Sequence, residues 1–178
     1  MKDQKKIFGD ERRDFLLQLL KESSEPITGS ELAAKANVSR QVIVGDITLL
    51  KAKGDPIIAT SQGYIYLKQA SLTPSFERVI ACYHPPENTE EELNILVDCG
   101  VTVKDVKIEH PVYGDLTAAV MVSNRKETKQ FMEKIKSTNA SYLSELTEGF
   151  HLHTLSAPSE KNLDDAEQAL RKAKFLVE

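Results

Sequence analysis

The spacing of apolar residues over the first seventy positions predicts three helices followed by a β-hairpin. Apolar residues recur at helical spacing in three segments: residues 10–21, 28–36 and 39–52. Thr28 and Glu31 have the spacing of a capping box, and Ser39 is a suitable N-cap for the third helix. Two short β-prone segments, residues 57–60 and 64–67, flank a Ser-Gln-Gly turn. This order is typical of a winged helix-turn-helix.

The pattern changes after residue 70. Residues 68–75 are polar and follow neither period, so we expect a boundary there between domains at 1–70 and 71–178. The second domain has the order β-α-β-β-α-β-α: residues 79–83, 89–98, 101–108, 116–122, 124–137, 150–155 and a last helix after Pro158. We predict an α+β protein. Its winged helix-turn-helix precedes a split-βαβ, ferredoxin-like antiparallel sheet with helices on one face.

Composition is that of an ordinary globular protein, with 40% apolar and 28% charged residues among 178. Apolar runs reach neither signal-peptide length nor the roughly 20 residues that a membrane span requires. We therefore expect a cytoplasmic protein with no membrane partner. Cys82 and Cys99 match neither a paired-thiol motif nor a zinc-ribbon spacing, and we interpret both as buried thiols.

The net charge of −4 argues against a protein that coats nucleic acid through bulk positive charge. The charge is unevenly divided, however. Residues 1–70 carry 11 basic and 9 acidic side chains, a net +2, whereas the remaining residues carry 12 and 18, a net −6. Any DNA contact is therefore expected in the first domain.

The segment from residue 31 to residue 54 combines a small-residue helix, a tight turn and an apolar-periodic helix. Helix-turn-helix geometry requires close packing of the first helix and exposes the start of the second to base edges. Arg40 suits guanine, Gln41 suits adenine, and Ser39 suits a phosphate oxygen. The predicted DNA-binding residues are Ser39, Arg40, Gln41, Val44, Lys51 and Lys53. Gly45 is unusual in mid-helix and permits close approach to DNA or to the wing. The alternative is a three-helix protein-interaction module.

The four histidines all lie in the second domain: His84, His110, His151 and His153. His151 and His153 alternate along one predicted strand and project from the same face. His84 ends the first strand of the domain, which a ferredoxin-like sheet places beside the last one. Glu92, in the first turn of the next helix, adds a carboxylate. We predict a divalent-metal site formed by His84, Glu92, His151 and His153.

Each of these residues also has a purely structural interpretation. A His-x-His pair on a strand is often two half-buried polar side chains, and Glu92 follows Thr89 at capping-box spacing. The convergence of three segments on one corner of the sheet favours the metal site. Cys82, on the same strand face as His84, is a reserve ligand.

His110 and Tyr113 lie between two predicted strands, near the same edge of the sheet. An imidazole and a phenol can hold a small aromatic acid through stacking and a charge-assisted hydrogen bond. We predict both as ligand-binding residues. Pro111 and Gly114 are equally typical of a plain hairpin turn, which remains the alternative.

Two resemblances extend these predictions. Residues 10–68, with the core ELAAKANVSRQVIVGDI, resemble the helix-turn-helix of biotin-ligase repressors. With His84, Glu92, HPVYG and FHLH, the whole chain looks like the niacin-responsive repressors of NAD biosynthesis, whose C-terminal part is called the three-histidine domain. The resemblance implies a homodimer on a palindromic operator of genes for NAD synthesis or niacin uptake. It also implies nicotinic acid as corepressor and a divalent metal at the four predicted ligands. The donor set suits one nickel or zinc ion per subunit.

Two other functions remain open. One is a metal-responsive regulator without an organic ligand, and the other is a metal-dependent enzyme fused to a helix-turn-helix. The second domain has no Gly-rich phosphate loop, no Ser or Cys nucleophile motif and no identifiable general base beside the metal ligands. We therefore predict that the protein is not an enzyme.

Overall fold

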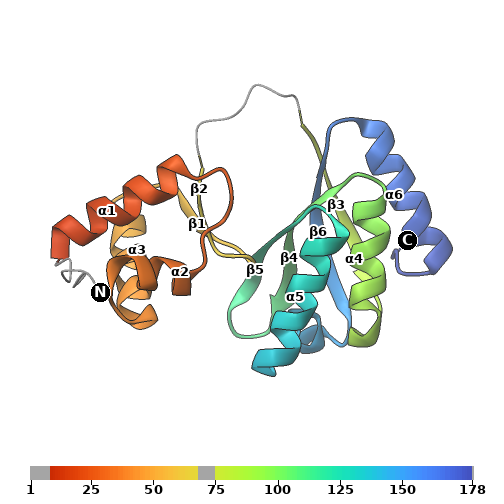
Figure 1. Cartoon of the computed structure of the whole chain (residues 1–178). Helices are drawn as coiled ribbons and strands as arrows, with labels where there is room; N and C mark the ends of the chain where they lie inside the picture. The colour runs from red at the N-terminus through yellow and green to blue at the C-terminus, as the bar shows by residue number, and fades with distance from the viewer. Residues whose placement is uncertain (1–8, 68–74, 178) are drawn as a thin grey trace. The chain divides into compact units, whose positions relative to one another are not determined.

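The computed structural model describes residues 9–67 and 75–177. The chain divides into two compact units, residues 1–71 and 72–178, each of which is described by itself (Figure 1). The predicted domain boundary falls within residues 68–74, which lie outside the described residues. None of the described helices is long and apolar enough to cross a membrane.

The first unit contains the predicted three helices and hairpin: α1 Gly9–Glu22, α2 Gly29–Ala36, α3 Arg40–Ala52, β1 Ile57–Ala59 and β2 Tyr64–Tyr66. The Thr28–Glu31 capping box is present at α2, and the Ser39 side chain accepts a hydrogen bond from the backbone of Val42 at α3. These caps satisfy backbone groups that a helix leaves unpaired at its start. Asn37, in the left-handed conformation, ends α2 and begins the turn. The winged helix-turn-helix prediction is confirmed.

One prediction for α3 is wrong at a single position. Helical periodicity in the sequence predicts Val42 on the apolar face of this helix, but 37% of it is exposed, and Asp46 takes the inward position instead. Asp46 is buried between two arginines of α1: Arg12 lies 2.6 Å and Arg13 lies 3.2 Å from its carboxylate oxygens. A buried carboxylate needs such partners because it has lost its hydration. The ion cluster therefore ties α3 to α1.

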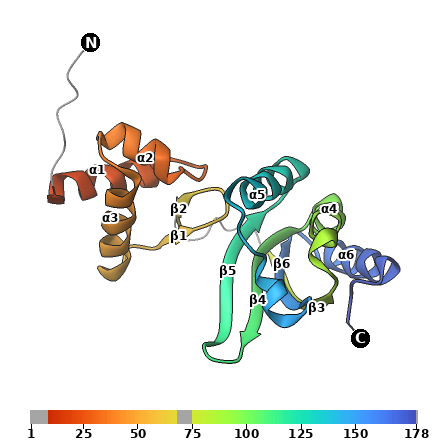
Figure 2. The same ribbon diagram turned by 90° about the horizontal axis from the view of Figure 1, so that it is seen from below.

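The second unit contains four strands and three helices: β3 Phe76–Tyr83, α4 Thr89–Asp98, β4 Thr102–His110, β5 Gly114–Val122, α5 Arg125–Thr138, β6 Phe150–Ala157 and α6 Glu160–Ala173. Two short 3-10 turns, η1 Pro86–Asn88 and η2 Leu143–Thr147, complete it. The sheet is antiparallel with the order β3-β6-β4-β5. The three helices cover one of its faces (Figures 1 and 2).

The split-βαβ arrangement and the adjacency of the first and last strands are as predicted. The strand order differs from a ferredoxin-like sheet in two respects. The first strand is at the edge with the last inside, and the third strand, β5, is at the other edge with the second, β4, inside. The exposed edge of β3 is instead paired by the C-terminal tail, through a bridge between Cys82 and Leu176 and a hydrogen bond from the Val177 amide to the Ala81 carbonyl. The tail thus lies beside the end of β3 that carries His84.

Candidate metal centre and nucleic-acid interface

Three imidazoles converge on one carboxylate beneath α4. His84 follows β3, while His151 and His153 project from the helix-covered face of β6. The Nε2 atom of His84 lies 2.8 Å from Oε2 of Glu92, and the Nε2 atoms of His151 and His153 each lie 3.3 Å from the same oxygen. We call these four residues the His–Glu cluster. The structure brings together all four predicted metal ligands.

Backbone carbonyls determine which nitrogen of each ring carries a hydrogen in the neutral form. The Nδ1 atom of His84 donates to the carbonyl of Pro85, that of His151 to Gly149 and that of His153 to Asp105. Since a carbonyl oxygen can only accept, each Nδ1 carries a hydrogen. A neutral ring then presents the Nε2 lone pair to Glu92, which also offers only lone pairs. The cluster therefore requires positive charge at its centre, supplied by extra protons or by a cation.

All four members of the cluster are buried, with exposed fractions from 1% for Glu92 to 6% for His151. Burial would raise the pKa of Glu92, but attraction to His153 and hydrogen bonds from the three rings outweigh it and hold that pKa well below its usual value. For His153 and His84, burial opposes the charged form, yet Glu92 raises the pKa of both. The carboxylate and the positive charge around it thus stabilise each other.

The cluster fits a divalent first-row transition metal. Three imidazole nitrogens with one carboxylate oxygen are a usual donor set for such ions, and in metal sites the second ring nitrogen commonly donates to a carbonyl, as here. The capping-box interpretation of Glu92 does not hold, because Asn88 is the N-cap of α4 and the Glu92 carboxylate faces the histidines. The Thr89 hydroxyl is buried without a partner.

Gly149 shapes the cluster through its backbone. Its carbonyl accepts from the His151 ring, and its φ of 102° lies in the region that favours glycine. A Cβ atom at this position would lie 2.6 Å from the carbonyl oxygen of His84. Sequence reasoning missed Gly149 as a positioning residue; the only available signal was its place two residues before His151. Reasoning also missed Phe175, whose ring centroid lies 5.0 Å from that of His84.

The predicted ligand-binding pair lies at the tip of the β4–β5 hairpin. The ring centroids of His110 and Tyr113 are 4.9 Å apart, and 74% of Tyr113 is exposed. The Nδ1 atom of His110 accepts from the amides of Val112 and Tyr113, as in a stabilised turn. Among the described residues, no contact joins this pair to the His–Glu cluster. In Figure 2 the hairpin projects well past the body of the sheet.

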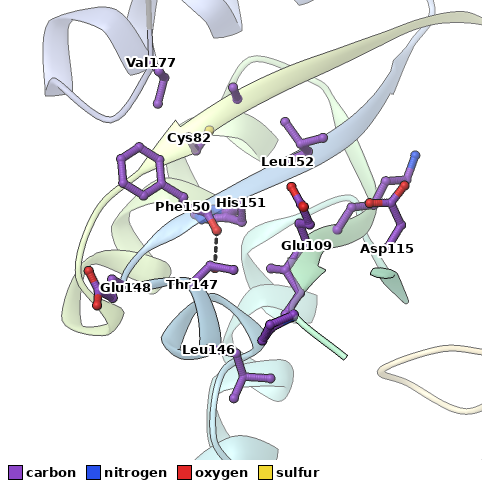
Figure 3. A pocket seen from close by; sticks show the side chains of 14 residues that line it. Cys82, Glu109, Asp115, Leu146, Thr147, Glu148, Phe150, His151, Leu152 and Val177 are labelled. Carbon is purple, nitrogen blue, oxygen red and sulfur yellow. Dashed lines mark hydrogen bonds between the residues drawn. The ribbon is translucent and has the colours of Figure 1, made fainter. Parts of the chain in front are cut away.

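A cavity of about 720 Å³ lies on the sheet face that the helices leave open, and its lining includes His151 of the cluster and Cys82. Phe150 and Leu152 line it from β6 because they alternate with the buried histidines (Figure 3). Three exposed carboxylates also line it, from Glu109, Asp115 and Glu148. Lys107 also lines the cavity, but the three carboxylates outnumber it and disfavour small anions.

The exposed face of α3 is the candidate DNA surface. Of the predicted residues, Arg40, Gln41, Lys51 and Lys53 are exposed and Val44 is half-buried, while the Ser39 hydroxyl caps the helix. Two further exposed residues, Thr48 and Ala52, lie on the same face of α3 as Gln41. Sequence reasoning missed them, although helical spacing indicates them. Nothing lies within 4 Å of a Cβ placed on Gly45. The wing therefore does not contact this position.

We expect Gly149→Ala to weaken zinc binding about tenfold or more, since disturbing groups that orient metal ligands typically costs 10- to 100-fold in affinity. The collision with the carbonyl of His84 displaces that ligand. Competition with a chromophoric chelator measures the affinity. Gly114→Ala is the matched control, because its φ of 68° is also positive but nothing lies within 4 Å of the added Cβ. Equal losses in both variants would contradict a positioning role.

The metal-free protein should lose thermal stability as the pH rises above 6.5. The raised pKa values of His84 and His153 contribute stability that is fully present below their ordinary value of 6.5 and lost as pH rises through the raised values. Glu92 contributes stability that is lost only when the pH falls below 4.5, its ordinary pKa, and on through its lowered pKa. Zinc replaces protons, so the increase in Tm that it causes should grow over the same pH range. A zinc effect independent of pH would argue against these ligands.

Comparison with known proteins assigns both units to families. Residues 77–178 match the 3H domain and residues 12–65 match an HTH domain. Transcription repressor NadR of Bacillus subtilis is 64% identical over 178 residues, covering 99% of each chain. The probable transcription repressor NiaR of Thermotoga maritima is 37% identical over 173 residues, covering 97% of each. These names favour a regulator over the enzyme alternative. The chain therefore belongs to the family of transcription repressors that join an HTH domain to a 3H domain and include NadR and NiaR.

Proposed function

We propose that the protein represses genes of NAD biosynthesis or niacin uptake and that nicotinic acid controls its DNA binding through a divalent metal in the His–Glu cluster. The observation that carries the metal part is the convergence of three buried Nε2 atoms on Oε2 of Glu92. The niacin part rests on the family resemblance. The metal is nickel or zinc, one ion per chain, because nitrogen-rich donor sets suit these ions rather than magnesium or calcium.

The metal is the best-supported partner for the carboxylate of nicotinate. A bound cation attracts an anion, whereas the cavity on the open sheet face is lined by the carboxylates of Glu109, Asp115 and Glu148. Phe175 packs against His84, so an effector approaching from this side must displace its ring. His110 and Tyr113 remain predicted contacts, and their substitution by alanine tests that role.

The proposed active form is a homodimer on a palindromic operator. A single helix-turn-helix reads one half-site, and two copies related by a twofold axis read successive major grooves. The open sheet face supports self-association, because large apolar side chains are 40–54% exposed on it: Val79, Tyr83, Phe150 and Leu152. Nicotinate then acts by favouring the dimer geometry that matches the operator.

Substitutions on α3 should separate base contacts from backbone contacts. Arg40→Ala and Gln41→Ala should weaken binding to an operator selected from random DNA by about 1–3 kcal/mol, with little effect on non-specific DNA. Lys51→Ala should weaken binding to the operator and to non-specific DNA about equally. It should also reduce the slope of log K against log salt concentration by about one. Fluorescence anisotropy over a range of salt concentrations measures both. Lys161→Ala, an exposed change on α6, is the control. Unchanged operator affinity in Arg40→Ala would remove this residue from the interface.

Nicotinate should raise the Tm of the full-length protein only when zinc or nickel is present, because a ligand that binds the native state stabilises it. Nicotinamide, which lacks the carboxylate, should have a smaller effect, and His153→Ala should abolish the response while leaving α3 able to bind DNA. Differential scanning fluorimetry with operator binding in parallel measures both. If metal alone restores full operator binding after chelation and nicotinate adds nothing, the protein is a metal sensor without an organic ligand.

A further inference from the structure

A fifth ligand-type side chain lies at the His–Glu cluster. Cys82 is fully buried near the end of β3, and His84 follows two residues later, just after the strand. The sheet register pairs it directly with His151 on β6. The ligand atoms of Cys82, Glu92 and His151 all lie within 4.8 Å of one another. A single ion can therefore reach all three with small side-chain adjustments.

Packing alone does not require sulfur at this position. Cys82 also contacts the apolar core of the domain, and in that role it is only a small hydrophobic residue. Its Sγ atom, however, faces a carboxylate and an imidazole, which are poor neighbours for an apolar group. Cys99, the other cysteine, caps the C-terminal end of α4 and is not part of this group of ligand atoms.

We propose that the Cys82 thiolate is a metal ligand, so that the site combines three imidazole nitrogens, one carboxylate oxygen and one sulfur. This inference rests on the proposed metal site and adds a residue to it. On metal binding the S–H bond breaks, the proton is released to solvent and the sulfur bonds to the ion. A thiolate is a soft donor, so it biases the site toward zinc, cobalt and nickel and away from manganese and magnesium.

Cobalt reports directly on sulfur ligation, because a thiolate bonded to Co²⁺ gives a charge-transfer absorption in the near ultraviolet that nitrogen and oxygen ligands do not give. The experiment titrates metal-free full-length protein with Co²⁺ under reducing conditions. It compares the wild type with Cys82→Ser, Cys82→Ala and the control Cys99→Ser. Circular dichroism and thermal unfolding establish that each variant is folded. Two different Cys82 substitutions guard against one that fails to fold.

The wild type and Cys99→Ser should show the charge-transfer band. Both Cys82 variants should lose it while keeping the visible d–d bands of bound cobalt. Visible bands without a charge-transfer band in the wild type would overturn the role of Cys82 and leave the metal site intact. A charge-transfer band that persists in Cys82→Ser would also overturn it. Absence of any cobalt spectrum in the wild type would overturn this inference and the proposed metal site together.

Discussion

The 3H domain depends on a buried carboxylate that faces three imidazoles. Removing an ionised carboxylate from water costs several kcal/mol, and only nearby positive charge can offset this. Glu92 is 1% exposed, and Oε2 has three Nε2 atoms within 3.3 Å. Because the Nδ1 hydrogens are committed to carbonyls, the ring atoms that face Glu92 are suited to hold a cation. The same geometry that costs stability without a cation is suited to bind one.

The sheet supplies the precision that such a site needs. Alternation along β6 places His151 and His153 on the helix-covered face, and α4 brings Glu92 over them. The ladder of β4 shifts register between Val103 and Asp105, and the Asp105 carbonyl accepts from His153. A bulge of this kind commonly re-aims backbone groups next to functional sites. The irregularity in β4 thus takes part in orienting a predicted metal ligand.

Much of this arrangement could be predicted because local patterns determine it. The capping residues Thr28 and Ser39 and the period-2 alternation of His151 and His153 are visible in a single segment. What could not be predicted depends on contacts between distant segments. The burial of Asp46 by arginines of α1, the covering of His84 by Phe175 and the steric role of Gly149 are examples. Periodicity indicates which face of an element is buried but not which partner covers it.

The most direct test of the central claim is the metal content of the purified full-length protein, measured by native mass spectrometry and elemental analysis after incubation with zinc or nickel. We expect one divalent ion per folded chain and a loss of that ion in Glu92→Gln and in His151→Ala. A wild-type protein that retains no ion, or variants that retain it as well as the wild type does, would contradict the account.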